Sequence, residues 1–322
     1  MAVVINTNVD SIRIRNILNS TTTSMSETMQ RMSSGMQILS AKDDAAGTVI
    51  AARMEVQLNG NQIAQKNVQN ASALLSTAEG NLDVIEDNIQ RIRDLTLQAK
   101  NGTYSAEEIQ AMQDEVAERM AEIDRINSSA SHSSLRLFGD QDDGGDPQGL
   151  AVDGATFQVG PNDGVDNTIK AGEELFQSVE FSALTGATNF NLVTIYEKQL
   201  GGTPANDVTY GVPASGLPGT DAADAVQAGE SQYDQAIRAL DLAIDNITQR
   251  KSIIGSAGNR MDSALNSLTT QYENLSSAKS IITDADIAQQ ASKFTQESIL
   301  QQVSTSLLAQ ANQAPSIALS LV

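Results

Sequence analysis

The sequence predicts a mainly α-helical protein with a β-containing insert, in which the N- and C-terminal flanks form a long antiparallel helical bundle or coiled coil. Three observations predict this fold class. Apolar residues recur with heptad spacing in both flanks, glycine and proline gather in one central region, and the chain has no Trp, five Tyr and six Phe. Since aromatic side chains usually dominate the energetics of a globular core, their scarcity favours burial between aliphatic helix faces.

The first heptad seam lies in the N-terminal flank. Nine of its ten positions are apolar, in the order Val68, Ala71, Leu75, Ala78, Leu82, Ile85, Ile89, Ile92, Thr96 and Ala99. A repeat of 3.5 residues rather than 3.6 predicts a left-handed supercoil.

A short turn separates this helix from the next one. Asn101–Gly102 is a stop signal, and Ser105 with Glu108 forms a capping box that begins a new helix. The apolar face of that helix consists of Ile109, Met112, Val116, Met120 and Ile123. Because the connection is short, the two helices are predicted to be antiparallel neighbours.

The C-terminal flank has a longer seam. Twelve of its fifteen positions are apolar, in the order Tyr233, Ile237, Leu240, Ile244, Ile247, Lys251, Ile254, Gly258, Met261, Leu265, Leu268, Tyr272, Leu275, Lys279 and Ile282. Gly255 and Gly258 interrupt this helix, and we expect a point of close packing there rather than a phosphate-binding loop. The flanks together predict a bundle of three helices.

The region from Gly139 to Glu230 has a different composition. It holds 15 of the 22 Gly, five of the six Pro and 15 acidic residues, but only two basic residues. Short strands are predicted where β-branched and aromatic residues lie between Gly and Pro, at Thr156–Val159, Val179–Leu184, Phe190–Tyr196 and Asp207–Tyr210.

The two ends of the chain carry seams of their own. One consists of Leu18, Thr22, Met25, Met29, Met32, Met36 and Leu39, and a shorter one of Leu300, Val303 and Leu307. With so little apolar content we expect these ends to order only on pairing with each other or with other copies of the chain. Residues 298–322 carry no charge, but Gln, Asn and Pro interrupt them, so we predict an amphipathic segment and no membrane-spanning helix.

Composition excludes several function classes. A net charge of −20 argues against nucleic-acid binding, and no Cys and a single His, His132, leave no cysteine site and no His–His metal pair. The acidic run Asp140–Asp146 misses the EF-hand spacing, and the Ser-rich stretch around His132 lacks a partnered acid. No catalytic, cofactor-binding or metal-ligating residue is predicted, and the first residues contain no signal-peptide apolar core.

Several motifs together resemble those of bacterial flagellins, the subunits of flagellar filaments. The N-terminal ones are Ile5–Asn8, Ser33–Gly35, Ser40–Gly47, Gln90–Leu95 and the hairpin motif Phe157–Gly164. The C-terminal ones are Asn259–Arg260, Asn274–Ser276, Asp284–Ala288 and Leu308–Gln313. The resemblance covers about residues 1–165 and 230–322, and residues 36–39 depart from the usual family pattern.

The resemblance implies a three-part architecture. Residues 1–42 and 282–322 would form an inner coiled-coil domain, residues 43–175 and 230–281 a helical bundle with a β-hairpin, and residues 176–229 a variable insert exposed to solvent. The inner-tube assembly seam would comprise Leu18, Met25, Met29, Met32, Met36, Leu39, Leu300, Val303 and Leu307.

The resemblance also implies the function and the partners. The chain would polymerise into the helical filament for swimming motility, outside the cell, after passing unfolded through the flagellar type III export apparatus with an export chaperone. Hook-associated and cap proteins would be further partners. One alternative is a hook–filament junction protein. Another, a flagellin with a metalloprotease insert, is excluded because residues 139–322 contain no His.

A surface patch follows from the motif Gln90–Leu95. In the family this helix contacts the next subunit along the filament and binds Toll-like receptor 5. The resemblance therefore assigns Gln90, Arg91, Leu95 and Glu115 to a receptor and axial interface. Ile89 and Ile92 belong to the internal seam, so Arg91 and Leu95 are expected to face outward. On the residues alone, scattered exposed charges and one exposed leucine are also typical of an ordinary solvated helix face.

Overall fold

The computed structural model describes residues 8–133, 135–139, 150, 154–188, 190–199, 209–210 and 231–320. Residue contacts divide the chain into two compact units: a terminal unit of Met1–Asn59 with Thr270–Val322, and a central unit of Gly60–Thr269. The predicted boundaries at residues 42/43 and 281/282 concern the assembled filament and stay a prediction.

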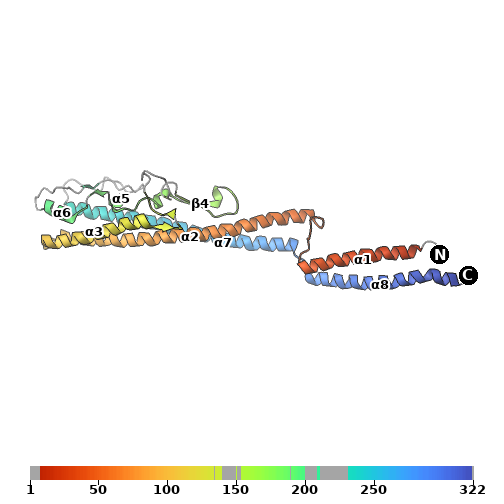
Figure 1. Ribbon diagram of the computed structural model, residues 1–322. Helices are drawn as coiled ribbons and strands as arrows, with labels where there is room; N and C mark the ends of the chain where they lie inside the picture. Colours follow the sequence, from red (N-terminus) through yellow and green to blue (C-terminus); the bar gives the residue numbers. More distant parts are fainter. Residues whose placement is uncertain are drawn as a thin grey trace. The chain divides into compact units, whose positions relative to one another are not determined.

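Long helices make up most of the described chain. They are α1 (Val9–Ser34), α2 (Ala45–Lys100), α3 (Ala106–Ser129), α7 (Gln232–Thr283) and α8 (Ile287–Ser320) (Figure 1). The predicted stop and capping signals coincide with the end of α2 and the start of α3. α2 ends just before Asn101–Gly102, and the capping box forms as predicted, since Ser105 and Glu108 each accept a hydrogen bond from the other's backbone N–H.

The core of the central unit lies between α2, α3 and α7. All ten positions of the first predicted seam are buried, from Val68 to Ala99, and so are alternate positions of the α7 seam such as Tyr233, Leu240 and Ile247. The heptad prediction is confirmed. Among the described residues, a Cβ at Gly255 or Gly258 would meet nothing within 4 Å, so the expectation of close packing at these glycines was wrong.

Ion pairs show the direction and register of α2 against α7 in the central unit. Lys251 contacts Asp83 at 2.6 Å, Arg93 contacts Asp241 at 2.5 Å, and Lys100 pairs with Asp234. From residue 83 to 93 to 100 on α2, the partner falls by the same steps from 251 to 241 to 234. The two helices are therefore antiparallel with a constant register. Lys251, a polar exception in the predicted seam, is explained by this pairing.

Short strands and helices pack on the bundle. The strands pair two by two and antiparallel: β1 (Ser131–His132) with β2 (Leu135–Arg136), β3 (Ala155–Gln158) with β4 (Thr168–Ala171), and β5 (Ala187–Thr188) with β6 (Thr209–Tyr210). Two 3₁₀ turns, η1 (Val165–Asn167) and η2 (Glu173–Leu175), flank β4. The strand prediction at Thr156–Val159 is confirmed within one residue, and that at Asp207–Tyr210 only for its last two residues, the others lying outside the described part.

Two predicted strands are helices. Residues 179–184 contribute to α5 (Phe181–Thr185), and residues 190–196 to α6 (Leu192–Gln199). Side chains of α3 accept the hydrogen bonds of their first N–H groups: Asp124 from Phe181 at 3.1 Å, and Gln113 from Leu192 at 2.7 Å. Phe181, Leu184, Phe190, Leu192 and Ile195 are buried in the bundle core, so tertiary contacts outweigh the local β propensity.

A buried arginine of α7 also forms a hydrogen bond with the segment that precedes α5. Arg250 is 1% exposed, and its Nη1 donates a 2.8 Å hydrogen bond to the carbonyl of Gln177. Burial lowers the pKa of the guanidinium to about 10. No sequence pattern indicated the burial of Arg250, because it lies beside the seam position Lys251 and not in the seam.

Candidate functional site

Three surfaces or contacts are candidates for function. The first is a polar ridge of the central unit, formed where α2 lies against α3. Arg91 donates two hydrogen bonds to Glu115, from Nε to Oε1 at 2.8 Å and from Nη2 to Oε2 at 3.0 Å. The hydrogen bond with Glu115 raises the pKa of Arg91, and the same bond lowers the pKa of Glu115. This planar bidentate pair is a rigid feature of an otherwise solvated face.

Neighbouring side chains extend the ridge. Arg119 donates to the Oδ1 of Asn88 at 3.0 Å and lies 3.6 Å from Glu115. Gln90 is exposed, and its Nε2 donates to Glu86 at 3.2 Å. We call Asn88, Gln90, Arg91, Glu115 and Arg119 the α2–α3 ridge. The structure thus brings three of the four predicted interface residues together.

Leu95 does not belong to this ridge. The expectation that it faces outward is wrong, because its side chain is only 3% exposed and lies in the core. α2 packs against both α3 and α7, and a helix with two partners buries a wider arc than one heptad seam. The exposed leucine of this turn is Leu97, at 40%.

The second candidate is the pair of terminal helices, α1 and α8. Asn8 caps α1 by accepting from the N–H of Ser11, and its Nδ2 donates to the carbonyl of Ala311 at 2.7 Å. Gln301 donates to Thr22, so residue numbers rise on α1 as they fall on α8, and the helices are antiparallel (Figure 1). The terminal segments predicted to pair with each other do so within one chain. That they order only on assembly stays a prediction.

The burial pattern of this pair is inverted. Among the side chains of α1 and α8 that the structure describes, the buried ones are polar: Thr28, Gln290, Glu297 and Ser304. Within the described residues, Oε2 of Glu297 and Oε1 of Gln290 have no hydrogen-bond partner. A buried polar group without a partner costs about 1–3 kcal/mol, so this pairing is weak.

Apolar side chains of the pair lie beside the buried polar positions and stay partly exposed. Leu300, Val303 and Leu307 are 46–48% exposed, and Met29 is 51% exposed. Leu18, Met25 and Met32 are half-buried. Within one chain, the predicted seam of α8 is therefore about half exposed, and we call Met29, Leu300, Val303 and Leu307 the terminal apolar face.

Met36 and Leu39 were predicted to continue the helical seam, and this is wrong. α1 ends at Ser34 because Gly35 adopts the left-handed conformation, with φ 71°. Met36 instead forms an antiparallel β-bridge with Asp284. Leu39 lines a groove of about 350 Å³ with Ile38 and with Ala51 and Ala52 of α2.

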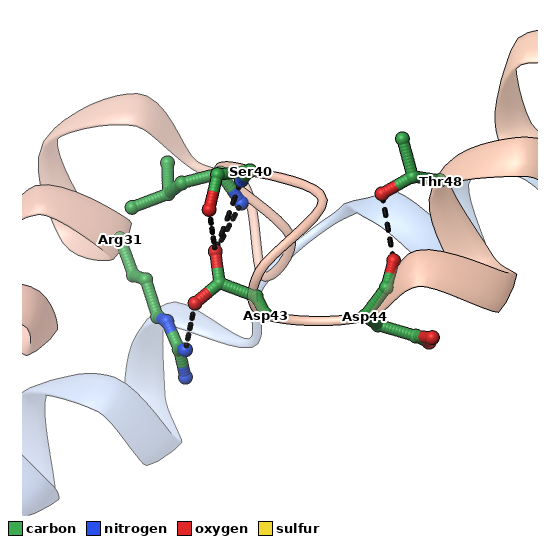
Figure 2. A network of polar contacts seen from close by, with 6 residues as sticks. Arg31, Ser40, Asp43, Asp44 and Thr48 are labelled. Carbon is green, nitrogen blue, oxygen red and sulfur yellow. Dashed lines mark hydrogen bonds and ion pairs between the residues drawn. The ribbon is translucent and has the colours of Figure 1, made fainter.

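The third candidate is the junction between α1 and α2, also in the terminal unit. The carboxylate of Asp43 accepts hydrogen bonds from the N–H groups of Leu39 and Ser40 at 3.2 and 3.0 Å, from Oγ of Ser40 at 3.2 Å, and from Arg31 at 3.3 Å (Figure 2). The bonds from Ser40 are the main reason that the pKa of Asp43 lies below its ordinary value. From the sequence, the motif Ser40–Gly47 is recognised only by its resemblance to the flagellin motif.

Asp44, the next residue, caps α2. Its Oδ1 accepts from the N–H groups of Ala46 and Gly47, both at 3.0 Å, and its carbonyl accepts from the hydroxyl of Thr48 at 2.7 Å (Figure 2). A Cβ on Gly47 would lie 2.5 Å from Oδ2 of Asp44 and 2.7 Å from Cδ1 of Ile38. Asp before an Ala-rich helix is a capping signal that could have predicted this role.

The described residues contain no cluster of three or more His, Cys, Asp or Glu side chains placed to hold a metal ion. None of the described helices is long and apolar enough to cross a membrane. His132 lies 3.4 Å from Thr77, between its Nδ1 and the threonine Oγ1. The acidic run Asp140–Asp146 lies outside the described residues.

Comparison with known proteins shows which family has this helical architecture. The model of the bacterial flagellin N-terminal helical region matches residues 5–143, and that of the C-terminal helical region matches residues 237–322. A flagellin of Xenorhabdus nematophila is 36% identical over the whole of both chains, and a flagellin of Serratia marcescens is 34% identical, again over both full lengths. The chain belongs to the bacterial flagellin family. As a flagellin, it is a structural subunit of the flagellar filament.

A solved structure supports the fold as well. A Vibrio parahaemolyticus structure, assigned to a flagellar hook-associated protein, covers 74% of this flagellin and 99% of its own chain with a TM-score of 0.51. At 14% identity this likeness concerns the fold alone, and the full-length flagellin relatives make the hook–filament junction reading the weaker one. The flagellin family is structural, and its members form the extracellular flagellar filament.

Proposed function

We propose that this flagellin polymerises by covering the terminal apolar face with other copies of the same chain. The observation that carries the proposal is the inverted burial of α1 and α8, which bury Glu297 and Gln290 while Leu300, Val303 and Leu307 remain exposed. A helix pair of this kind gains stability when its apolar face is covered. Contacts between two different surfaces of identical subunits give a ring when the rotation between subunits closes and a helical filament when it does not, and the proposal is the second case.

The α2–α3 ridge is the proposed axial contact and the proposed site for Toll-like receptor 5. Support comes from the bidentate pair Arg91–Glu115 on an exposed face and from the exposed Gln90 beside it. Arginine is favoured as an anchor at protein interfaces. In this proposal the filament hides the ridge and the free subunit presents it. The flagellar type III export apparatus, an export chaperone, the cap and the hook-associated proteins are the further proposed partners.

A matched pair of variants tests the assembly proposal. Leu307→Glu places a charge on the terminal apolar face, and Ser306→Glu places the same charge on the neighbouring exposed position of α8. We expect Leu307→Glu to abolish sedimentable polymer after addition of salt, while Ser306→Glu polymerises and the circular dichroism of both soluble chains is unchanged. Equal polymerisation of the two variants would contradict the proposed surface.

A further inference from the structure

The two chain connections of the terminal unit touch each other. One runs from α1 to α2 through residues 35–44, and the other from α7 to α8 through residues 284–286. The N–H of Gln37 donates to the carbonyl of Thr283 at 2.7 Å, and the N–H of Ala285 donates to the carbonyl of Gly35 at 2.8 Å. Met36 and Asp284 lie between these two hydrogen bonds as an antiparallel β-bridge. Segments about 250 positions apart in the sequence are thus joined backbone to backbone.

Both connections are built in the same way. In each, one aspartate accepts hydrogen bonds from the local residues: Asp43 from Leu39, Ser40 and Arg31, and Asp284 from the hydroxyls of Ser280 at 2.6 Å and Thr283 at 2.8 Å. A second aspartate then caps the following helix. Asp44 caps α2, and Asp286 caps α8 by accepting from the N–H groups of Ala288 and Gln289 at 2.9 and 3.2 Å.

Asp43 has the widest reach of these groups. Through Arg31 it holds the last turn of α1, through Leu39 and Ser40 it holds the connection, and it directly precedes the cap of α2 (Figure 2). The side chains of Arg31 and Asp43 are only 23% and 26% exposed. A charge-assisted network of this kind fixes a connection more firmly than neutral hydrogen bonds do.

We propose that the two connections form a single latch, and that Asp43 is the positioning residue that holds it closed. The latch joins the α1–α8 pair, as one body, to the first turns of α2 and the last turns of α7 within the terminal unit. It thereby fixes the direction in which the terminal apolar face is presented. The direction of the terminal apolar face matters only if the chain polymerises as proposed. The latch itself is tested separately, by hydrogen exchange.

Hydrogen exchange of two amides tests the latch. We expect the amides of Gln37 and Ala285 to be protected in sedimented wild-type polymer. Asp43→Asn removes the charge, and Ser40→Ala removes one donor as a milder change. The expected result is several-fold faster exchange at both amides in Asp43→Asn and a smaller increase in Ser40→Ala. Glu27→Gln, which removes an exposed carboxylate of α1, is the control and leaves both rates unchanged.

Ala285 decides between a latch and a local loop contact. Its N–H donates to Gly35, whereas the carboxylate of Asp43 accepts from Arg31, Leu39 and Ser40, so a merely local role would speed exchange at residues 37–44 alone. Faster exchange at Ala285 in Asp43→Asn supports the latch, and an unchanged rate overturns it. Unprotected Gln37 and Ala285 in wild-type polymer also overturn it. The variants are added as a minor, isotope-labelled fraction to wild-type chain, so that they enter the polymer even if they elongate poorly alone. Failure of the wild type to polymerise counts instead against the proposed function, and the exchange is then compared in the soluble chains.

Discussion

Replacement of Leu95 by alanine tests whether this side chain belongs to the core of the central unit or to its surface. Leu95 is 3% exposed, and truncation of a buried leucine costs about 2–5 kcal/mol through lost transfer free energy and the cavity that remains. Leu97, two positions along the same helix, is 40% exposed, so the same truncation there costs about 1 kcal/mol or less. The pair keeps the chemistry of the change constant and alters only the burial.

The expected difference is large enough to measure by thermal unfolding. In a domain of about 200 residues, 1 kcal/mol shifts Tm by about 2–4 °C, so a central value of about 3 kcal/mol for Leu95→Ala predicts a fall of about 6–12 °C. Circular dichroism at the helix minimum follows the melt, with Leu97→Ala as control. Equal Tm values for the two variants would refute the burial argument. Because Leu95→Ala weakens the fold, the α2–α3 ridge is tested by substitutions at its own residues, such as Arg91 and Glu115, and not at Leu95.

Three further predictions concern caps and titrating groups. Ser105→Ala removes the capping box of α3 and is expected to cost about 1 kcal/mol in thermal unfolding, whereas Ser76→Ala, at an exposed site on α2, does not lower Tm. Burial raises the pKa of Tyr233 to about 12, and a raised folded-state pKa contributes stability that is lost as the pH rises from 10 towards 12. Wild type should therefore lose more stability than Tyr233→Phe over this interval, and parallel losses in an alkaline denaturation series would contradict this. Hydrogen bonds lower the pKa values of Asp43 and Asp284 in the folded chain, so their contribution is present above the ordinary value of 3.8 and is lost as the pH falls below it. The double variant Asp43→Asn/Asp284→Asn should show a smaller acid-induced rise in exchange at Gln37 and Ala285 than wild type, and an equal rise would count against it.

Heptad periodicity predicted the helical bundle well because the spacing of apolar residues along a helix decides which face is buried against its neighbours. Every predicted position from Val68 to Ala99 is buried, and the capping box at Ser105 begins α3 as expected. These signals are local, and they agree with the tertiary contacts that α2 makes. Constant register between α2 and α7 then follows from two matching heptad repeats.

Elsewhere the decisive contacts come from distant residues. Asp124 and Gln113 of α3 accept the first N–H groups of α5 and α6, which the sequence around Phe181 and Leu192 could not indicate. A local signal existed only for α6, where Asn191 accepts from the N–H groups of Val193 and Thr194. Leu95 is buried because α2 has two partners, and a single seam describes only one of them. Glycine is a common helix-stop residue, so Gly35 could have predicted the end of α1. The heptad spacing of Met32 and Met36 instead suggested that the helix continues, and the left-handed conformation of Gly35 ends it.

Electron microscopy of the purified wild-type chain after salt-induced polymerisation tests the central claim most directly. If the terminal apolar face makes contacts that do not close, the images show long filaments of uniform diameter, and they disappear when Leu307→Glu replaces wild type. Discrete closed rings or small oligomers, or filaments that persist unchanged in Leu307→Glu, would contradict the account.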